Sequence, residues 1–157
     1  MKKTNWTLLL ICILIPLAVG GLAAFLTQNN METFGSLNQP PLTPPAWLFP
    51  VVWTILYTLM GIASYLVLTS GKNPIAIRTS LWVYGIQLFF NFLWTIIFFN
   101  LQAYTFAFVW LILLWLLILL NTFLFYRISK PAGWLLVPYF LWVTFAAYLN
   151  LAIAILN

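Results

Sequence analysis

The side chains that could do chemistry in this chain are aromatic rings that carry one polar atom. Trp53 and Tyr57 stand four residues apart in an apolar stretch, so a helix would place them on one face. We expect this helix to start at Thr43, with the hydroxyl as N-cap and Pro44 in the first turn. Counted from residue 46, where the membrane span is expected to begin, both rings would lie roughly 10 to 16 Å along the helix, deeper than an aromatic belt at the membrane surface. Trp47, nearer the start, suits such a belt, whereas the deeper N–H and O–H groups need partners inside the protein.

Two further apolar stretches also gather polar and aromatic residues on one helical face. These residues are Gln87, Asn91, Trp94 and Phe98 in one stretch, and Pro138, Trp142, Phe145, Ala146 and Leu149 in the other. Hydrogen bonding between helices, worth about 0.6 kcal/mol on average, is one explanation for buried amides. For Asn121 and Asn150 this explanation is as good as a role in ligand binding. The other explanation is a cavity for a flat, largely apolar ligand. We expect its walls to be Trp53, Tyr57, Asn91, Trp94 and Trp142.

The composition excludes most familiar catalytic centres. Glu32 is the single acid, the chain has no histidine, and Cys12 is the single cysteine. A carboxylate pair, a Ser-His-Asp triad, a Cys/His metal site and the usual axial ligand of haem iron therefore cannot form. We see no ionisable residue at membrane depth, as an ion-coupled transporter would need. The chemistry that the composition still allows is that of a ligand that stacks on aromatic rings and is itself reactive. We expect no cofactor in addition to such a ligand.

The elements that must position these residues are membrane-spanning helices. The chain is 65% hydrophobic and 4% charged, against about 25% charged residues in ordinary domains. Its six bases are too scattered to form a nucleic-acid patch. We predict an all-α membrane protein, one domain over residues 1–157, whose five spans form a helix bundle. The spans are expected at about 5–27, 46–69, 78–100, 103–126 and 132–155.

The first span could instead be a cleaved signal peptide, since small residues occur between Ala18 and Ala24. Its apolar run is too long for the core of a signal peptide, which favours a span. Gly20, Gly21, Ala23 and Ala24 form a surface of small residues that suits either a dimer contact or close packing within one chain.

The connections and the bases predict the orientation. We expect a long, polar, proline-rich loop from Gln28 to Pro45, a short turn at Asn100–Gln102, and a turn in which Pro131 opens the last helix. All six bases fall at the N-terminus and in the second and fourth connections. The positive-inside rule then places the N-terminus in the cytoplasm, and the first loop and the C-terminus outside.

The chain resembles the translocator protein family, which includes the tryptophan-rich sensory proteins (TspO/MBR) and the peripheral benzodiazepine receptor. The most specific segment runs from Pro44 to Gly61, and the residues already named around Asn91 and Trp142 support it over nearly the full length. The resemblance implies a five-helix bundle in a bacterial cell membrane, usually a homodimer, with a pocket under the first loop. It also implies binding of protoporphyrin IX and of isoquinoline carboxamides, and in bacteria a light- and oxygen-dependent breakdown of the porphyrin.

The resemblance assigns the pocket tryptophans to Trp53 and Trp142, which we take as candidate catalytic residues. The full set of expected ligand-binding residues is Trp47, Trp53, Tyr57, Asn91, Trp94, Phe98, Trp142, Phe145 and Ala146. Two departures stand out. Leu42 occupies a position where many relatives have tryptophan, and no base follows Leu149, so the animal sterol motif is missing. A loose match to such a motif at Leu124, Tyr126 and Lys130 is a weak pattern.

Three functions fit these observations. The leading hypothesis is a tetrapyrrole-binding membrane protein that promotes photo-oxidation of protoporphyrin IX, with indoles donating electrons or trapping the reactive product. The carboxylates of the porphyrin are expected near the positive end of the second helix, at residues 43–46. The alternative is a non-enzymatic carrier or sensor for porphyrins or other apolar molecules. A structural membrane protein with packing tryptophans is the third.

Overall fold

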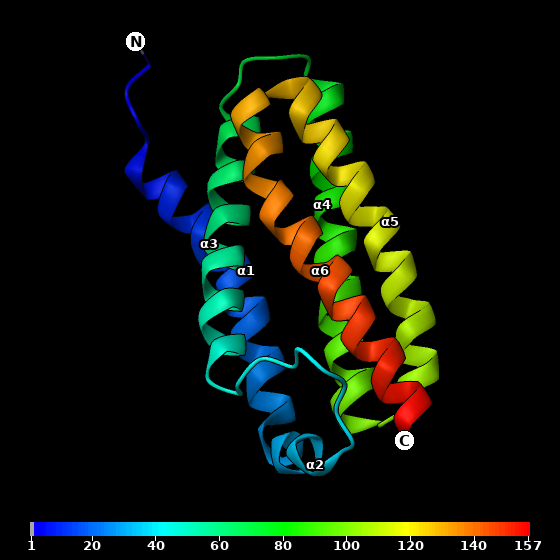
Figure 1. Cartoon of the computed structure of the whole chain (residues 1–157). Helices are drawn as coiled ribbons and strands as arrows, with labels where there is room; N and C mark the ends of the chain where they lie inside the picture. The colour runs from blue at the N-terminus through cyan, green and yellow to red at the C-terminus, as the bar shows by residue number, and fades with distance from the viewer. Residues whose placement is uncertain (1) are drawn as a thin grey trace.

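The computed structural model describes residues 2–157, and they form a bundle of helices with no strand (Figure 1). The long helices are α1 (Trp6–Thr27), α3 (Leu48–Leu68), α4 (Pro74–Thr95), α5 (Tyr104–Ile128) and α6 (Lys130–Leu156). Two short elements, η1 (Gln28–Asn30) and α2 (Met31–Ser36), follow α1, and a π-helical turn, η2 (Ile96–Asn100), extends α4. Five helices are long and apolar enough to cross a membrane, which confirms the predicted fold class.

Local sequence signals explain where most helices begin. The side chain of Asn5 accepts a hydrogen bond from the N–H of Leu8 at 3.0 Å and caps α1. Asn73 accepts one from the N–H of Ile75 at 2.9 Å, and Pro74 occupies the first turn of α4. The third span therefore begins before the predicted residue 78. Pro131 lies in the first turn of α6, as predicted.

The predicted start of the second long helix at Thr43 is wrong. The Thr43 hydroxyl donates instead to the carbonyl oxygen of Pro40 at 2.7 Å, which closes a turn one residue after Leu42 adopts a positive φ of 70°. The helix begins at Leu48, and its N-cap Trp47 makes no side-chain capping bond. Trp53 consequently lies less than two turns into α3.

The first connection is also more structured than the polar loop that the sequence predicted. Met31 and Phe34 lie on α2, and the ring of Phe34 packs edge-on against Phe49 at 6.2 Å and Phe99 at 5.6 Å between centroids. Apolar residues three positions apart lie on the same face of a short helix. Its continuation is tied to the end of the chain, because the N–H of Asn38 donates to Asn157 Oδ1 at 3.0 Å.

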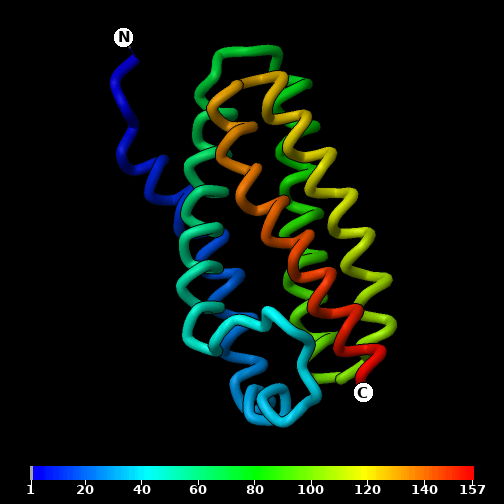
Figure 2. Tube along the Cα trace, viewed as in Figure 1, coloured from blue at the N-terminus to red at the C-terminus, as the bar shows by residue number. Residues whose placement is uncertain are grey.

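The helices surround a common interior. α6 packs between α3 and α5, α4 packs against α5, and α1 packs against α3 and more lightly against α4. Figure 2 shows the connection from α2 to α3 running across the end of the bundle that holds the C-terminus. The crossing of α1 and α3 is close, since a Cβ on Gly61 would stand 2.4 Å from the Cα of Ile13.

The bases lie at the end of the bundle that carries the N-terminal segment and the α3–α4 and α5–α6 turns (Figure 1). Glu32, the single acid, lies on α2 at the other end. The cytoplasmic placement of the basic end stays a prediction from the positive-inside rule.

Candidate ligand-binding cavity

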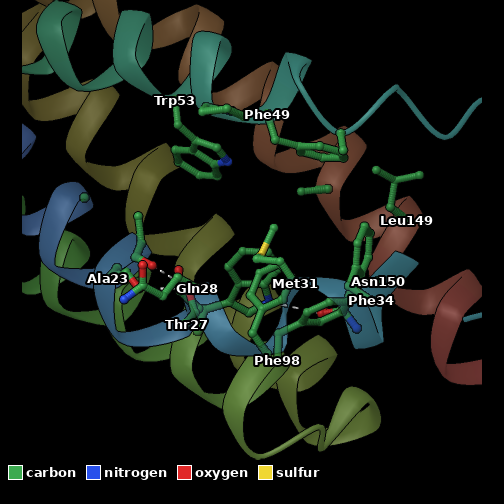
Figure 3. A pocket seen from close by; sticks show the side chains of 18 of the residues that line it. Ala23, Thr27, Gln28, Met31, Phe34, Phe49, Trp53, Phe98, Leu149 and Asn150 are labelled. Atoms are coloured by element: carbon green, nitrogen blue, oxygen red, sulfur yellow. Dashed lines mark hydrogen bonds between the residues drawn. The ribbon is translucent and has the colours of Figure 1, made fainter. Parts of the chain in front are cut away.

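A cavity of about 350 Å³ lies between α1, α3, α4 and α6, at the end of the bundle that α2 covers. Figure 3 shows Trp53 and Phe49 on one side of it, and Thr27, Met31 and Phe98 facing them from the other. Its walls are mostly carbon. The polar side chains among its lining residues are those of Thr27, Gln28, Tyr57, Trp53, Trp94, Thr95, Trp142 and Asn150.

Indoles from α3 and α6 both line this cavity. The ring of Trp53 stacks on Tyr57, with centroids 5.5 Å apart and planes 29° apart, and meets Tyr139 edge-on at 6.2 Å. The ring of Trp142 meets Phe49 edge-on at 6.0 Å. Such offset and edge contacts fix the orientation of aromatic rings. The two predicted tryptophans therefore share one cavity, with their orientation set by neighbouring rings.

The tryptophans differ in what their N–H groups bind. Trp94 Nε1 donates to Asn150 Oδ1 at 3.0 Å, Trp110 to a backbone carbonyl at 2.9 Å, and Trp115 to a threonine hydroxyl at 2.8 Å. Within residues 2–157, neither Trp53 nor Trp142 donates its N–H to a protein group, although both are partly buried. A buried indole N–H usually finds a partner. These two donors are thus available to a molecule in the cavity.

Six of the nine residues that the sequence proposed for ligand binding line the cavity. They are Trp53, Tyr57, Trp94, Phe98, Trp142 and Ala146.

The other three lie elsewhere. Trp47 is 67% exposed in the last turn before α3, as an anchoring residue would be. Phe145 packs against the outer side of Trp142 and contacts Tyr148, with centroids at 5.6 and 6.1 Å. Asn91 is only 1% exposed and uses its amide within the protein, so the expectation that it walls the cavity is corrected.

Asn91 belongs to a buried chain of hydrogen bonds next to the cavity. Its Nδ2 donates to the Tyr139 hydroxyl at 2.8 Å, and its Oδ1 accepts from the Tyr57 hydroxyl at 3.4 Å. The Tyr139 hydroxyl donates to Gln87 Oε1 at 2.7 Å, and Gln87 Nε2 donates to the sulfur of Met60 at 3.8 Å. The chain connects α3, α4 and α6 and ends at Tyr57, so it holds one wall of the cavity in place.

The other two buried amides differ: Asn150 fits both explanations that the sequence left open, and Asn121 fits neither. Asn150 lines the cavity, yet its Oδ1 accepts from Trp94 and its Nδ2 donates to the carbonyl of Tyr104 at 2.9 Å, which joins α6 to α4 and α5. Asn121 is 1% exposed and makes no hydrogen bond within the described residues.

Sequence reasoning missed the wall that α1 and α2 supply. Gly20, Ala23, Ala24 and Thr27 repeat at helical spacing and line the cavity, followed by Met31 and Phe34. A Cβ on Gly20 would stand 2.2 Å from the Tyr57 ring, so the absence of a side chain there lets the ring occupy its position. The regular spacing of small residues was the available signal, and three of the four residues of the predicted small-residue surface, all except Gly21, line the cavity.

Comparisons with known proteins agree with this architecture. The model of the TspO/MBR family matches residues 12–156. The chain is 42% identical to the tryptophan-rich protein TspO of Chlorobaculum tepidum, over 100% of this chain and 99% of the relative. It is 39% identical to the TspO of Archaeoglobus fulgidus over 92% and 94% of the two chains, and 34% identical to the human translocator protein over 80% and 75%. With nearly its whole length matched, the chain belongs to the TspO/MBR family of membrane proteins.

Proposed function

We propose that this protein binds a metal-free tetrapyrrole such as protoporphyrin IX in the cavity and promotes its photo-oxidative degradation. The observation that carries the proposal is the pair of unbonded indole N–H groups, on Trp53 and Trp142, in one largely apolar cavity. A flat aromatic ligand would replace the missing contacts of both rings by stacking and by hydrogen bonds to its ring or substituents.

The dimensions of the cavity decide how such a ligand would sit. Its volume of about 350 Å³ lies at the lower end of the range for small-molecule sites, roughly 300–1,000 Å³. A tetrapyrrole would therefore extend toward the open rim, where Gln28 and Ala46 are exposed. The N-terminal turn of α3 also borders the cavity through Phe49 and Pro50, and the positive end of the helix favours the ligand's carboxylates. We therefore expect the carboxylates near Phe49, slightly beyond the residues that the sequence suggested.

The chemistry would come from the ligand, with the protein supplying electrons and shape. A porphyrin excited by light takes one electron from an indole of Trp53 or Trp142, which becomes a radical cation. The reduced porphyrin passes that electron to oxygen, giving superoxide. The porphyrin then returns one electron to the indole radical cation, and superoxide adds to the resulting porphyrin cation, so oxygen is the net oxidant and the indole is restored. The chain contains no histidine for the usual axial ligation of haem iron, which favours the metal-free ring.

Saturable quenching of tryptophan fluorescence by protoporphyrin IX tests the binding step. Removing the two cavity indoles whose N–H groups are unbonded, as W53F/W142F, should abolish most of the saturable amplitude, because the third cavity indole, Trp94, is buried and hydrogen-bonded to Asn150. The matched double variant W6F/W82F removes two exposed indoles, at 74% and 67%, and should keep it. An isoquinoline carboxamide should compete with the porphyrin. Non-saturable quenching in the unmodified protein would leave only the structural explanation.

One observation favours a carrier or sensor as the second candidate. The cavity lining contains no acid, base or nucleophile of ordinary strength. A carrier needs only reversible binding, and porphyrin loss under light would then be a side reaction. A single defined product supports degradation as the function, whereas mixed bleaching debris supports the carrier.

We further propose that the protein is a homodimer in a bacterial cell membrane, with its basic end in the cytoplasm. Gly20 and Ala23 are used inside the chain, but Gly21 is exposed, and a Cβ added to it would meet no atom within 4 Å. The exposed side of α1 is therefore still open to a second copy.

A further inference from the structure

A second hollow lies on the outer surface between α5 and α6, at the basic end of the bundle. It has a volume of about 320 Å³, and its walls are apolar. The residues that form it include Leu119, Phe123, Tyr126, Gly133, Trp134 and Val137. Several of them are exposed, among them Trp134 at 65% and Phe123 at 54%. In a membrane-spanning bundle, this surface faces lipid.

Close helix packing shapes this groove. A Cβ on Gly133 would stand 2.4 Å from the Cβ of Tyr126, so glycine allows α5 and α6 to approach where they leave the turn. The rings of Tyr126 and Trp134 meet edge-on with centroids 6.4 Å apart and close that end of the groove. Aromatic rings with polar tips are typical of the headgroup level of a bilayer.

Two unpaired bases stand at the same end. The guanidinium of Arg127 lies 5.8 Å from the ring centroid of Phe123, a wall of the groove, and Lys130 begins α6. Neither base forms an ion pair within residues 2–157, because the single acid, Glu32, and the C-terminus lie at the opposite end. An anion at the mouth of the groove would meet positive charge and no carboxylate.

The groove covers most of one leaflet. From Leu119 to Tyr126, the groove residues at its two ends on α5, the helix rises roughly 10 Å, at about 1.5 Å per residue. The hydrocarbon core of a bilayer is about 30 Å thick, so the groove covers about a third of it and ends one residue before Arg127. Basic pockets between spans are known binding sites for anionic headgroups.

We propose that this groove binds one anionic phospholipid, with an acyl chain along Leu119, Phe123 and Val137. Its glycerol lies at the level of Tyr126 and Trp134, and its phosphate lies between Arg127 and Lys130. The groove shares no residue with the cavity, so the lipid site does not depend on the proposed function.

Native mass spectrometry of the full chain tests this assignment, with phosphatidylglycerol and phosphatidylcholine supplied in equal amounts. We expect one retained phosphatidylglycerol. Removing both bases, as R127Q/K130Q, should lower its retention about thirtyfold, the factor that two cations of about 1 kcal/mol each provide. Filling the groove with V137F should release the lipid while leaving the charge unchanged. The matched variant K2Q/K3Q, which removes two bases at the same end but away from the groove, should bind as the unmodified protein does.

Three results would overturn the proposal. If K2Q/K3Q and R127Q/K130Q lowered the retention of phosphatidylglycerol equally, the lipid would respond only to the net charge of this end of the bundle. Retention of a neutral lipid or sterol that is insensitive to R127Q/K130Q would assign the groove to another ligand. Conversion of a dimer to a monomer by V137F, with lipid retention unchanged, would make a second copy of the chain the occupant.

Discussion

Replacing Tyr139 by phenylalanine removes one oxygen atom and leaves two buried amide atoms, Gln87 Oε1 and Asn91 Nδ2, without a partner. Tyr139 is 1% exposed, and its hydroxyl both donates to Gln87 Oε1 at 2.7 Å and accepts from Asn91 Nδ2 at 2.8 Å. The same substitution at Tyr57 removes one bond, the 3.4 Å contact with Asn91. The two variants are chemically matched, so their difference reports the hydrogen-bonded chain itself.

The geometry sets the expected magnitudes. A buried group left unsatisfied costs about 1–3 kcal/mol, whereas side-chain bonds within membranes average about 0.6 and reach about 1.7 kcal/mol. Two short bonds in a fully buried site place Y139F near 2 kcal/mol, or about a thirtyfold change in the unfolding equilibrium. A single bond of 3.4 Å is long for an O–H donor, which places Y57F below about 0.5 kcal/mol.

Unfolding in mixed micelles, titrated with a denaturing detergent and followed by near-ultraviolet circular dichroism, measures both values. The account requires Y139F to lose several times more free energy of unfolding than Y57F. Equal losses, or a neutral Y139F, would show that the chain of hydrogen bonds does not hold this part of the bundle together.

Three other substitutions or fusions test separate parts of the structure. Ala146→Leu adds three carbons to the cavity wall and should weaken porphyrin binding about tenfold by overpacking. Ala18→Leu, on the exposed side of α1, should leave the affinity unchanged. Equal porphyrin affinities of the two variants would contradict binding in this cavity. Gly21→Leu should lower the dimer fraction in cross-linking, while Gly85→Leu, at an equally open position on α4, should leave it unchanged. A periplasm-active reporter should work when fused after Asn157 and fail within the α3–α4 turn; the reverse pattern would refute the orientation.

The sequence predicted the helices well because membrane spans depend on length and apolarity alone. Pro131 marked the start of the last span for an equally local reason, whereas the bases predicted only the orientation. The start of α3 was mispredicted, since the Thr43 hydroxyl can either cap a helix or close a turn, and the carbonyl of Pro40 receives it. Only the folded chain decides between these two partners.

The cavity was predicted less completely than the bundle. Trp53, Trp94 and Trp142 could be predicted as cavity residues, because their indole N–H groups lie deep in the membrane and need partners inside the protein. Asn91 is also a polar residue at depth, but its amide donates to the hydroxyl of Tyr139 inside the protein. Sequence spacing cannot show whether the partner of such a group is a ligand or a neighbouring helix. The small residues of α1 carry no polar signal, so their part in the wall depends on how closely α1 approaches Tyr57.

The most direct test of the account is the rate of protoporphyrin IX loss per bound molecule under light and oxygen. It is measured at saturating porphyrin for the unmodified protein and for W53F/W142F, with W6F/W82F as the control. Phenylalanine keeps the aromatic walls but cannot supply an electron as readily as an indole. The account predicts that the cavity variant binds porphyrin and loses the light-dependent product, while the control turns over normally. Identical product and rate in all three proteins would contradict it.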